Sequence, residues 1–311
     1  MRTVQVWGIG SVALRTEGGG EPADFDITRS FSGRGYRRLP AACQYLLAAA
    51  QRAVDDSGEL IGSVPPERRG AFVGTNNAGS RLLAEMDEAI IGGSSDDISP
   101  MLAPFFSLSL FAGRLSIEYA LRGGNLTITS PRTAGLEAAA VCLRSIAAGR
   151  ADLAVLGAME DSPPPGEPGH RDGDVGAVAL ICARPHPGGP DLNPYGSFEV
   201  ATGHLSPDQP VEPVLDRVWS RLGQPELAVS VFADDTATGA AVLTWLVRRR
   251  HRVTLYPPGP GCLTPLHHLT ESFRRPGADL VVVAAAAEGN VAFARSRVAV
   301  RTPARRHEGS R

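Results

Sequence analysis

Two rhythms of apolar and polar positions alternate along the chain. Runs that alternate, or that are apolar throughout, predict strands, whereas runs whose apolar residues return every three or four positions predict helices. In the first half, the strand pattern occurs at residues 4–9, 69–75, 125–129, 151–158 and 175–183. The helical pattern occurs at residues 39–57, 81–91, 104–121 and 133–148.

The second half repeats this order of elements with little residue identity. Strands are predicted at residues 197–201, 227–233, 252–255, 279–285 and 291–300, and helices at residues 211–222, 238–250 and 266–274. Each half therefore reads as βαβαβαββ, the first over residues 1–185 and a shorter second over 195–301. Residues 302–311 form a basic segment that we expect to be a disordered tail.

Alternating strands and helices predict the fold class. Such βαβ units form mostly parallel sheets that are covered by helices on both faces. Two halves of one pattern suggest two sheets that share a middle helical layer. We therefore predict an α/β protein with a five-layer αβαβα architecture.

Composition and charge narrow the range of possible functions. The 311 residues carry a formal net charge of -2, which gives no general reason to bind nucleic acid or an anionic membrane. No apolar run approaches the length of a membrane span, and the N-terminus has no secretory pattern. The four cysteines, Cys43, Cys142, Cys182 and Cys262, lack metal-ligand or CxxC spacing, so we expect reduced buried thiols in a cytoplasmic protein.

Several motifs resemble one enzyme family in order and spacing. They are Gly70-Ala71-Phe72-Val73-Gly74-Thr75, Ser99-Pro100, the segments 112–117 and 123–128, the segment 147–160, and the closing strand 173–180. Together they resemble the N-terminal half of a β-ketoacyl synthase. In the C-terminal half the resemblance rests on segments 233–238 and 286–290, which take the places of the AHGTGT and FGFGG-N motifs. The resemblance implies the thiolase-like five-layer fold and no cofactor.

The catalytic positions of that family are occupied by other residues here. The family's S-T-A-C-A-S-G corresponds without a gap to residues 129–135, and this puts Arg132 at the nucleophilic cysteine. A guanidinium is always protonated and cannot be a nucleophile. The family's two histidines would fall at Asp234 and near Cys262, and a carboxylate cannot donate the hydrogen bond that imidazole gives to an enolate oxygen. The resemblance therefore implies that catalytic residues have been lost.

Other candidate chemistry is weaker. Cys142 falls in the middle of a predicted helix among packing positions, so we interpret it as a core residue. His267 and His268 are adjacent and cannot share one helix face as a metal pair would, so no metal site is expected.

The resemblance implies a role as a partner. In type II polyketide synthases an active ketosynthase pairs with a related chain-length factor that lacks the cysteine, and this sequence is similar to that second subunit. Expected partners are a catalytic ketosynthase and an acyl carrier protein with its polyketide chain. Where chain-length factors commonly carry glutamine, this chain has Arg132, which suggests a divergent branch such as polyene-forming systems.

The family's dimer forms through the strand before the nucleophile, here residues 125–129. Residues Thr127, Thr129 and Arg132 would then lie at the interface, and Phe105, Phe106, Leu108 and Phe111 would wall a tunnel for the acyl chain. Simple core packing is the alternative for each of these apolar side chains. Two rival functions stay open: a homodimeric enzyme with cysteine-independent decarboxylase or hydrolase activity, and a homodimeric protein that only binds acyl groups or carrier protein.

Overall fold

The computed structural model describes residues 4–14, 25–33, 35–93, 100, 103–164, 166, 175–185, 193–256, 261–275, 277 and 279–299. The expected tail at residues 302–311 lies outside the described residues. No helix among the described residues combines the length and the apolar character that crossing a bilayer requires.

The first half contains five strands and the helices between them. Its strands are β1 (Gln5–Leu14), β2 (Arg69–Thr75), β3 (Asn125–Thr129), β4 (Leu153–Glu160) and β5 (Val175–Ala183). Its helices are α1 (Ala41–Asp56), α2 (Leu60–Ser63), α3 (Ser80–Gly92), α4 (Ser109–Glu118) and α5 (Ala134–Ala147), with 3-10 turns at Ile27–Arg29, Tyr36–Arg38, Pro66–Arg68 and Ala103–Phe106.

The second half repeats the pattern without the additional helices. Its strands are β6 (Gly196–His204), β7 (Val229–Ala233), β8 (Val253–Tyr256), β9 (Val281–Ala285) and β10 (Asn290–Val298). Its helices are α6 (Val211–Arg221), α7 (Ala237–Arg248) and α8 (Leu263–Ser272).

Strand order demonstrates the duplication. The strands run β3-β2-β4-β5-β1-β6-β10-β9-β7-β8 in one ten-stranded sheet. From either end of the sheet inward, the strands are the third, second, fourth, fifth and first strand of their half. The two halves therefore share one strand order. The second and third strands of each half pair in parallel, as do the second and fourth, and the fifth strand pairs antiparallel with both of its neighbours.

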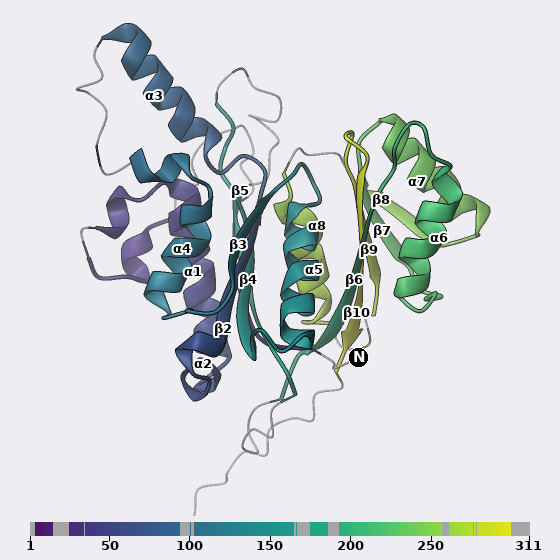
Figure 1. Ribbon diagram of the computed structural model, residues 1–311, viewed down its shortest axis with the longest axis horizontal. Helices are drawn as coiled ribbons and strands as arrows, with labels where there is room; N and C mark the ends of the chain where they lie inside the picture. Colours follow the sequence, from purple (N-terminus) through teal and green to yellow (C-terminus); the bar gives the residue numbers. More distant parts are fainter. Residues whose placement is uncertain are drawn as a thin grey trace, which may run out of the picture.

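The two predicted sheets are joined at one corner. The join between β1 and β6 consists of only two residue pairs, Gln5 with Ser197 and Val6 with Gly196. This short contact lets the two five-stranded halves face each other, with α5 and α8 between them (Figure 1). Helices α1 and α4 cover one outer face, and α6 and α7 cover the other, which makes five layers.

Each helical layer has its own apolar core. One core packs α1 and α4 against the first half-sheet, a second surrounds α5 and α8, and a third lies under α6 and α7. The strands β4 and β5 are buried along their whole length because helices cover both faces. The central core includes Cys142, which has no exposed surface, so the packing interpretation of this thiol is confirmed.

The prediction of one long helix over residues 104–121 is wrong. A 3-10 turn at Ala103–Phe106 comes first, and α4 spans only Ser109–Glu118. Between them, amide N–H groups bond back three residues, as from Ser107 to the Pro104 carbonyl at 3.2 Å. At the other end Ala120 has a left-handed φ of 50°, which stops the helix. Periodicity alone does not report such local turns.

Candidate functional site

Arg132 occupies the turn between the end of β3 and the start of α5. Its φ is 57°, a left-handed conformation that is strained for a residue with a side chain. The side chain is 4% exposed and reaches across the central layer to Asp234, 102 positions later in the chain. Its Nε donates to Oδ2 of Asp234 at 2.7 Å, and its Nη2 donates to Oδ1.

Asp234 follows the end of β7 and precedes α7. Its own carbonyl accepts from the N–H of Thr236 at 2.8 Å, and the hydroxyl oxygen of Thr236 caps α7 by accepting from the N–H of Gly239 at 3.2 Å. Gly239 packs so closely on the Asp234 carbonyl that no side chain would fit there. These local contacts hold the carboxylate toward Arg132.

A bidentate arginine–aspartate pair therefore connects the two halves. The Asp234 side chain is 35% exposed, so water reaches the anion but hardly reaches the cation. Two parallel N–H to oxygen bonds are the strongest geometry for this type of pair. A pair of this kind fixes two segments in place, and its guanidinium has no nucleophilic chemistry.

Next to Arg132, a short hydroxyl network holds the start of α5. The Thr133 hydroxyl donates to Glu137 at 2.9 Å and lies 3.0 Å from the Ser130 hydroxyl, which also donates to Glu137 at 3.3 Å. All three groups belong to the first turn of α5 and the residues before it. The network orients the turn that carries Arg132.

Cys262, the third position expected to be lost, lies in the same central layer. It is the N-cap residue of α8 and has no exposed surface. Its carbonyl oxygen lies 2.8 Å from where a Cβ on Gly135 would be, so the starts of α5 and α8 are in contact. The structure thus places Cys262 beside the helix that Arg132 precedes.

Glu160 is a site residue that the sequence analysis quoted only inside a motif. It ends β4, and its Oε1 accepts from the N–H groups of Asn76 and Cys262, both at 2.8 Å. Its Oε2 accepts from the N–H of Asn77 at 2.9 Å. One carboxylate therefore fixes the loop after β2, the end of β4 and the start of α8. The sequence signal for it is a charged residue at the end of an otherwise apolar buried strand.

The environment of Glu160 perturbs its ionisation. Loss of solvent raises the pKa of Glu160 to about 7, although the backbone N–H groups of Cys262, Asn77 and Asn76 favour the charged form and lower the pKa. All the donors point at its oxygens, so the geometry is complementary to the carboxylate. Within the described part of the chain, no group of three or more His, Cys, Asp or Glu side chains could hold a metal ion.

The predicted tunnel residues differ in how deeply they are buried. Phe105 and Phe111 pack against each other in the chain's own outer core, with ring centroids 5.6 Å apart and exposures of 6% and 0%. Leu108 is half-buried against the same core. The Phe106 side chain lies outside the described residues. In this structure Phe105 and Phe111 therefore have the packing role that was the alternative.

The predicted interface strand lies at one end of the sheet. β3 pairs only with β2, so its other edge is open along Asn125–Thr129 in the described residues. Thr129 is exposed, whereas Thr127 is half-buried and its hydroxyl has no hydrogen-bond partner among the described residues. An open strand edge is a surface for another chain.

Known proteins resemble this chain in sequence and in fold. The family model described as "Beta-ketoacyl synthase, N-terminal domain" matches residues 13–169. The 3-oxoacyl-[acyl-carrier-protein] synthase 2 of Vibrio harveyi is 33% identical over 142 residues, which are 46% of this chain and 34% of that protein. The matched segment thus spans about a third of the length of this curated relative.

Two solved structures superpose on nearly the whole chain. The first is a type II polyketide synthase acyl carrier protein in complex with its ketosynthase bound to a hexaketide (TM-score 0.75, 15% identity, 96% of this chain and 100% of that one). The second is the ishigamide ketosynthase/chain length factor (TM-score 0.69, 18% identity, 95% and 99%). At these identities the likeness establishes the thiolase-like ketosynthase fold. With a family model that matches half of its residues and this fold, the chain belongs to the β-ketoacyl synthase family.

Proposed function

We propose that this chain is a non-catalytic, chain-length-factor-like subunit that pairs with an active ketosynthase in type II polyketide biosynthesis. The observation that carries the proposal is the ion pair between Arg132 and Asp234. In the motif comparison, these residues fall where active members of the family have the nucleophilic cysteine and the first histidine.

The pair has no route to acyl transfer or decarboxylation. The Arg132 guanidinium cannot attack a thioester, and Asp234 already accepts two of its N–H bonds. Cys262 is a thiol at the start of α8, but it is buried and its N–H is committed to Glu160. Activity would therefore have to come from the partner subunit.

The open edge of β3 is the surface we assign to the ketosynthase. Two exposed apolar side chains flank it: Ile117 on α4 is 71% exposed, and Leu126 on β3 is 39% exposed. The amide of Asn125 donates to the Ser116 hydroxyl at 2.8 Å and ties α4 to the edge strand. Pairing with a strand of another chain would cover both apolar groups and satisfy the free backbone positions.

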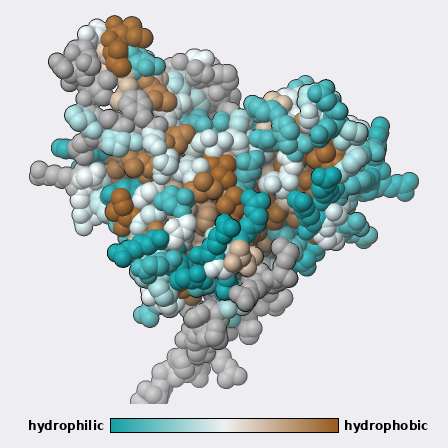
Figure 2. Space-filling model, viewed as in Figure 1, coloured by the Kyte–Doolittle hydropathy of each residue, from teal (hydrophilic) through white to brown (hydrophobic). Residues whose placement is uncertain are grey.

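More apolar surface lies on α3. Leu83, Ile90 and Ile91 are exposed, and hydrophobic residues are visible at the far end of this projecting helix (Figure 2). The first residue before α3, Gly79, lies against the Leu108 side chain. This contact connects α3 with the segment between the 3-10 turn and α4. Helices α3 and α4 therefore lie on the same side of the molecule.

We place the acyl tunnel on the β3 side of α4. Phe105, Phe111 and Leu108 would act from behind α4 by fixing where it lies, while the partner chain forms the nearer wall. The substrate would be a polyketide chain on an acyl carrier protein, with polyene systems as one candidate branch. We place the complex in the cytoplasm, because all four cysteines are buried free thiols.

The first experiment is affinity purification of the tagged protein from its native host, with mass spectrometry of the co-purifying chains and their stoichiometry. We expect a cysteine-bearing ketosynthase at a one-to-one ratio. The purified chain alone should neither decarboxylate malonyl-carrier protein nor hydrolyse acyl-carrier protein. A stable self-dimer without ketosynthase, or acyl turnover by the isolated chain, would overturn the proposal in favour of one of its two rivals.

A matched pair of variants locates the interface. Leu126→Arg places a charge beside the β3 edge and should weaken the heterodimer by about 100-fold, measured by light scattering after size-exclusion chromatography. Leu255→Arg makes the same change beside β8, the strand at the opposite end of the sheet, where Leu255 is 55% exposed. This control should leave pairing unchanged. Equal effects of the two variants would contradict the assignment to β3.

A further inference from the structure

The duplicated sheet ends in two equivalent edge strands, β3 in the first half and β8 in the second. Among the described residues, β3 pairs only with β2 and β8 only with β7. Apolar surface lies beside β8 too, since Leu255 is 55% exposed and Val247 on α7 is 65% exposed. An open edge with apolar surface can accept another strand. If both edges did so, copies would join β3 to β8 in an open-ended row, because the two surfaces differ and no rotation has to close the series.

The hydrogen-bond register shows which residues of the two edges correspond. The Ala71 N–H of β2 donates to the Gly124 carbonyl at 2.8 Å. In the second half, the Val229 N–H of β7 donates to the Arg252 carbonyl at 2.8 Å. The two bonds are equivalent, because in each half the donor opens the parallel register of the second and third strands. Arg252 therefore takes the place of Gly124.

Alternate backbone groups of an edge strand point away from the sheet, because the others bond to the neighbouring strand. Along β3 the outward groups belong to Asn125, Thr127 and Thr129, which gives three N–H donors. Along β8 they belong to Val253 and Leu255, which gives two. Since β8 ends one residue later, it offers a new strand fewer bonds than β3 does.

The residues that follow β8 cannot extend it as a pairing edge. Counted along the sequence from the equivalent bonds, Pro257 and Pro258 correspond to Thr129 and Ser130 of the first half. Proline has no backbone N–H, so these two positions have no donor for an added strand. At the other end of β8, the exposed Arg252 replaces a glycine. Charged side chains and prolines at an edge are features that block strand addition.

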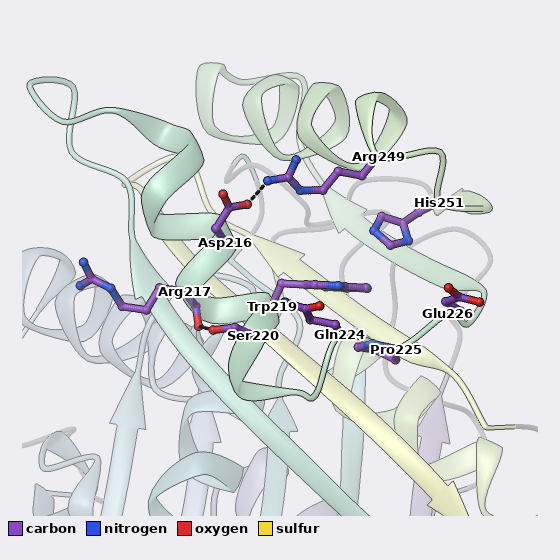
Figure 3. A pocket seen from close by; sticks show the side chains of 9 residues that line it. All are labelled: Asp216, Arg217, Trp219, Ser220, Gln224, Pro225, Glu226, Arg249 and His251. Atoms are coloured by element: carbon purple, nitrogen blue, oxygen red, sulfur yellow. Dashed lines mark hydrogen bonds and ion pairs between the residues drawn. The ribbon is translucent and has the colours of Figure 1, made fainter.

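The basic segment before β8 leaves unpaired charge at this edge. Arg249 points to Asp216 of α6 and is paired with it (Figure 3). Arg250 and Arg252 are exposed, and neither forms an ion pair within the part of the chain that the structure describes. A strand that paired with β8 would lie beside the Arg252 guanidinium and would have to desolvate or neutralise it.

We infer that the β8 end of the sheet is closed to strand addition, by Arg252 before the strand and by Pro257 and Pro258 after it, so that the chain accepts a partner strand only at β3. Assembly through strand edges then stops at two chains. The first half lacks this protection, because residues 123–130 include no charged residue and no proline. The inference does not depend on which chain pairs with β3, so it stands apart from the proposed function.

The test transfers the residues that border β3 to β8. The triple variant Arg252→Gly, Pro257→Thr and Pro258→Ser is compared with the parent chain by light scattering after size-exclusion chromatography, over a range of concentrations. We expect the parent to level off at one or two copies. The variant should keep growing with concentration, to at least about twice the parent mass. Adding Leu255→Arg to the variant should return its mass to that of the parent.

A second variant keeps the test decisive if the triple variant does not fold, which circular dichroism checks. Pro257→Thr with Pro258→Ser leaves every residue of β8 unchanged and should show the same growth to a smaller extent. The inference would be overturned by a parent chain that grows beyond two copies, by folded variants that stay at the parent mass, or by growth that Leu255→Arg does not reverse. Failure to find a ketosynthase partner would not change these outcomes, because each comparison uses this chain alone.

Discussion

Two arginine–aspartate pairs in this molecule have the same chemistry and different surroundings. Arg132 and Asp234 meet in the central layer, where the cation is 4% exposed and the anion 35%. Arg249 and Asp216 meet on the outer layer, where the exposures are 38% and 48%. The difference teaches that burial decides what such a pair does. In the centre the pair connects two segments that lie 102 positions apart, and at the surface it joins α6 to the end of α7.

The largest expected effect separates the two pairs directly. Asp234→Ala leaves a buried guanidinium without its anion and should lower the free energy of unfolding by about 3 kcal/mol. Asp216→Ala at the exposed pair should cost about 1 kcal/mol, which includes its hydrogen bond from Trp245. Urea denaturation measures both.

The neighbouring exposed Asp235 provides the control for this comparison. Asp235→Ala should change the free energy of unfolding by less than about 0.5 kcal/mol. Similar losses for Asp234→Ala and Asp216→Ala would show that burial does not distinguish the pairs.

The second effect is a dependence of stability on pH, which has one sign for Glu160 in the central layer and the opposite sign for His251 in the outer layer. Because the pKa of Glu160 is raised from 4.5 to about 7, the folded state holds a proton that the unfolded state releases. Stability should therefore fall as the pH rises from about 4.5 to about 7, by roughly 3 kcal/mol, and stay level above that. Glu160→Gln should flatten this part of the profile.

His251 should act in the other direction. Its lowered pKa means that the unfolded state binds the proton more tightly, so its contribution to stability is present above pH 6.5 and is lost as the pH falls through the lowered pKa. His251→Phe should remove this loss in acid. The effect should be smaller than that of Glu160, because His251 is less buried. The two assignments would be contradicted if Glu160→Gln and His251→Phe changed the dependence of stability on pH in the same direction.

The third effect concerns backbone strain in the central pair, at Arg132, and next to the outer pair, at Arg250. Arg132 and Arg250 have φ values of 57° and 59°. Glycine adopts this conformation without strain, so Arg250→Gly should be more stable than Arg250→Ala by about 1 kcal/mol. Arg132→Gly should likewise exceed Arg132→Ala by about 1 kcal/mol, although both lose the ion pair. Thermal unfolding of the four variants measures the two differences, and a zero difference would argue against strain.

Much of the fold was predictable because period and burial are local signals. The strands at residues 69–75, 125–129 and 175–183 were predicted with the boundaries that the structure has. The two βαβαβαββ halves and the five layers also followed from the order of elements. The break before α4 was missed, because a 3-10 turn and a helix have similar apolar spacing.

The sequence also pointed to Arg132 and Asp234, but not to what they do together. A gapless motif comparison put Arg132 at the nucleophile, and a fainter one put Asp234 at a histidine. That the two form a pair across 102 positions depends on how the half-sheets face each other. The three-way contact of Glu160 was equally invisible, because its donors are backbone N–H groups of two other segments.

The sequence by itself determined the family, the order of elements and the absence of a nucleophile at residue 132, since these depend on residue identity and local period. The tertiary structure alone decided that Phe105 and Phe111 face a core, that Arg132 has a counter-ion, and that Glu160 joins the loop after β2 to the start of α8. Each of these depends on which distant segments pack together, and packing is set by the shape of the whole sheet.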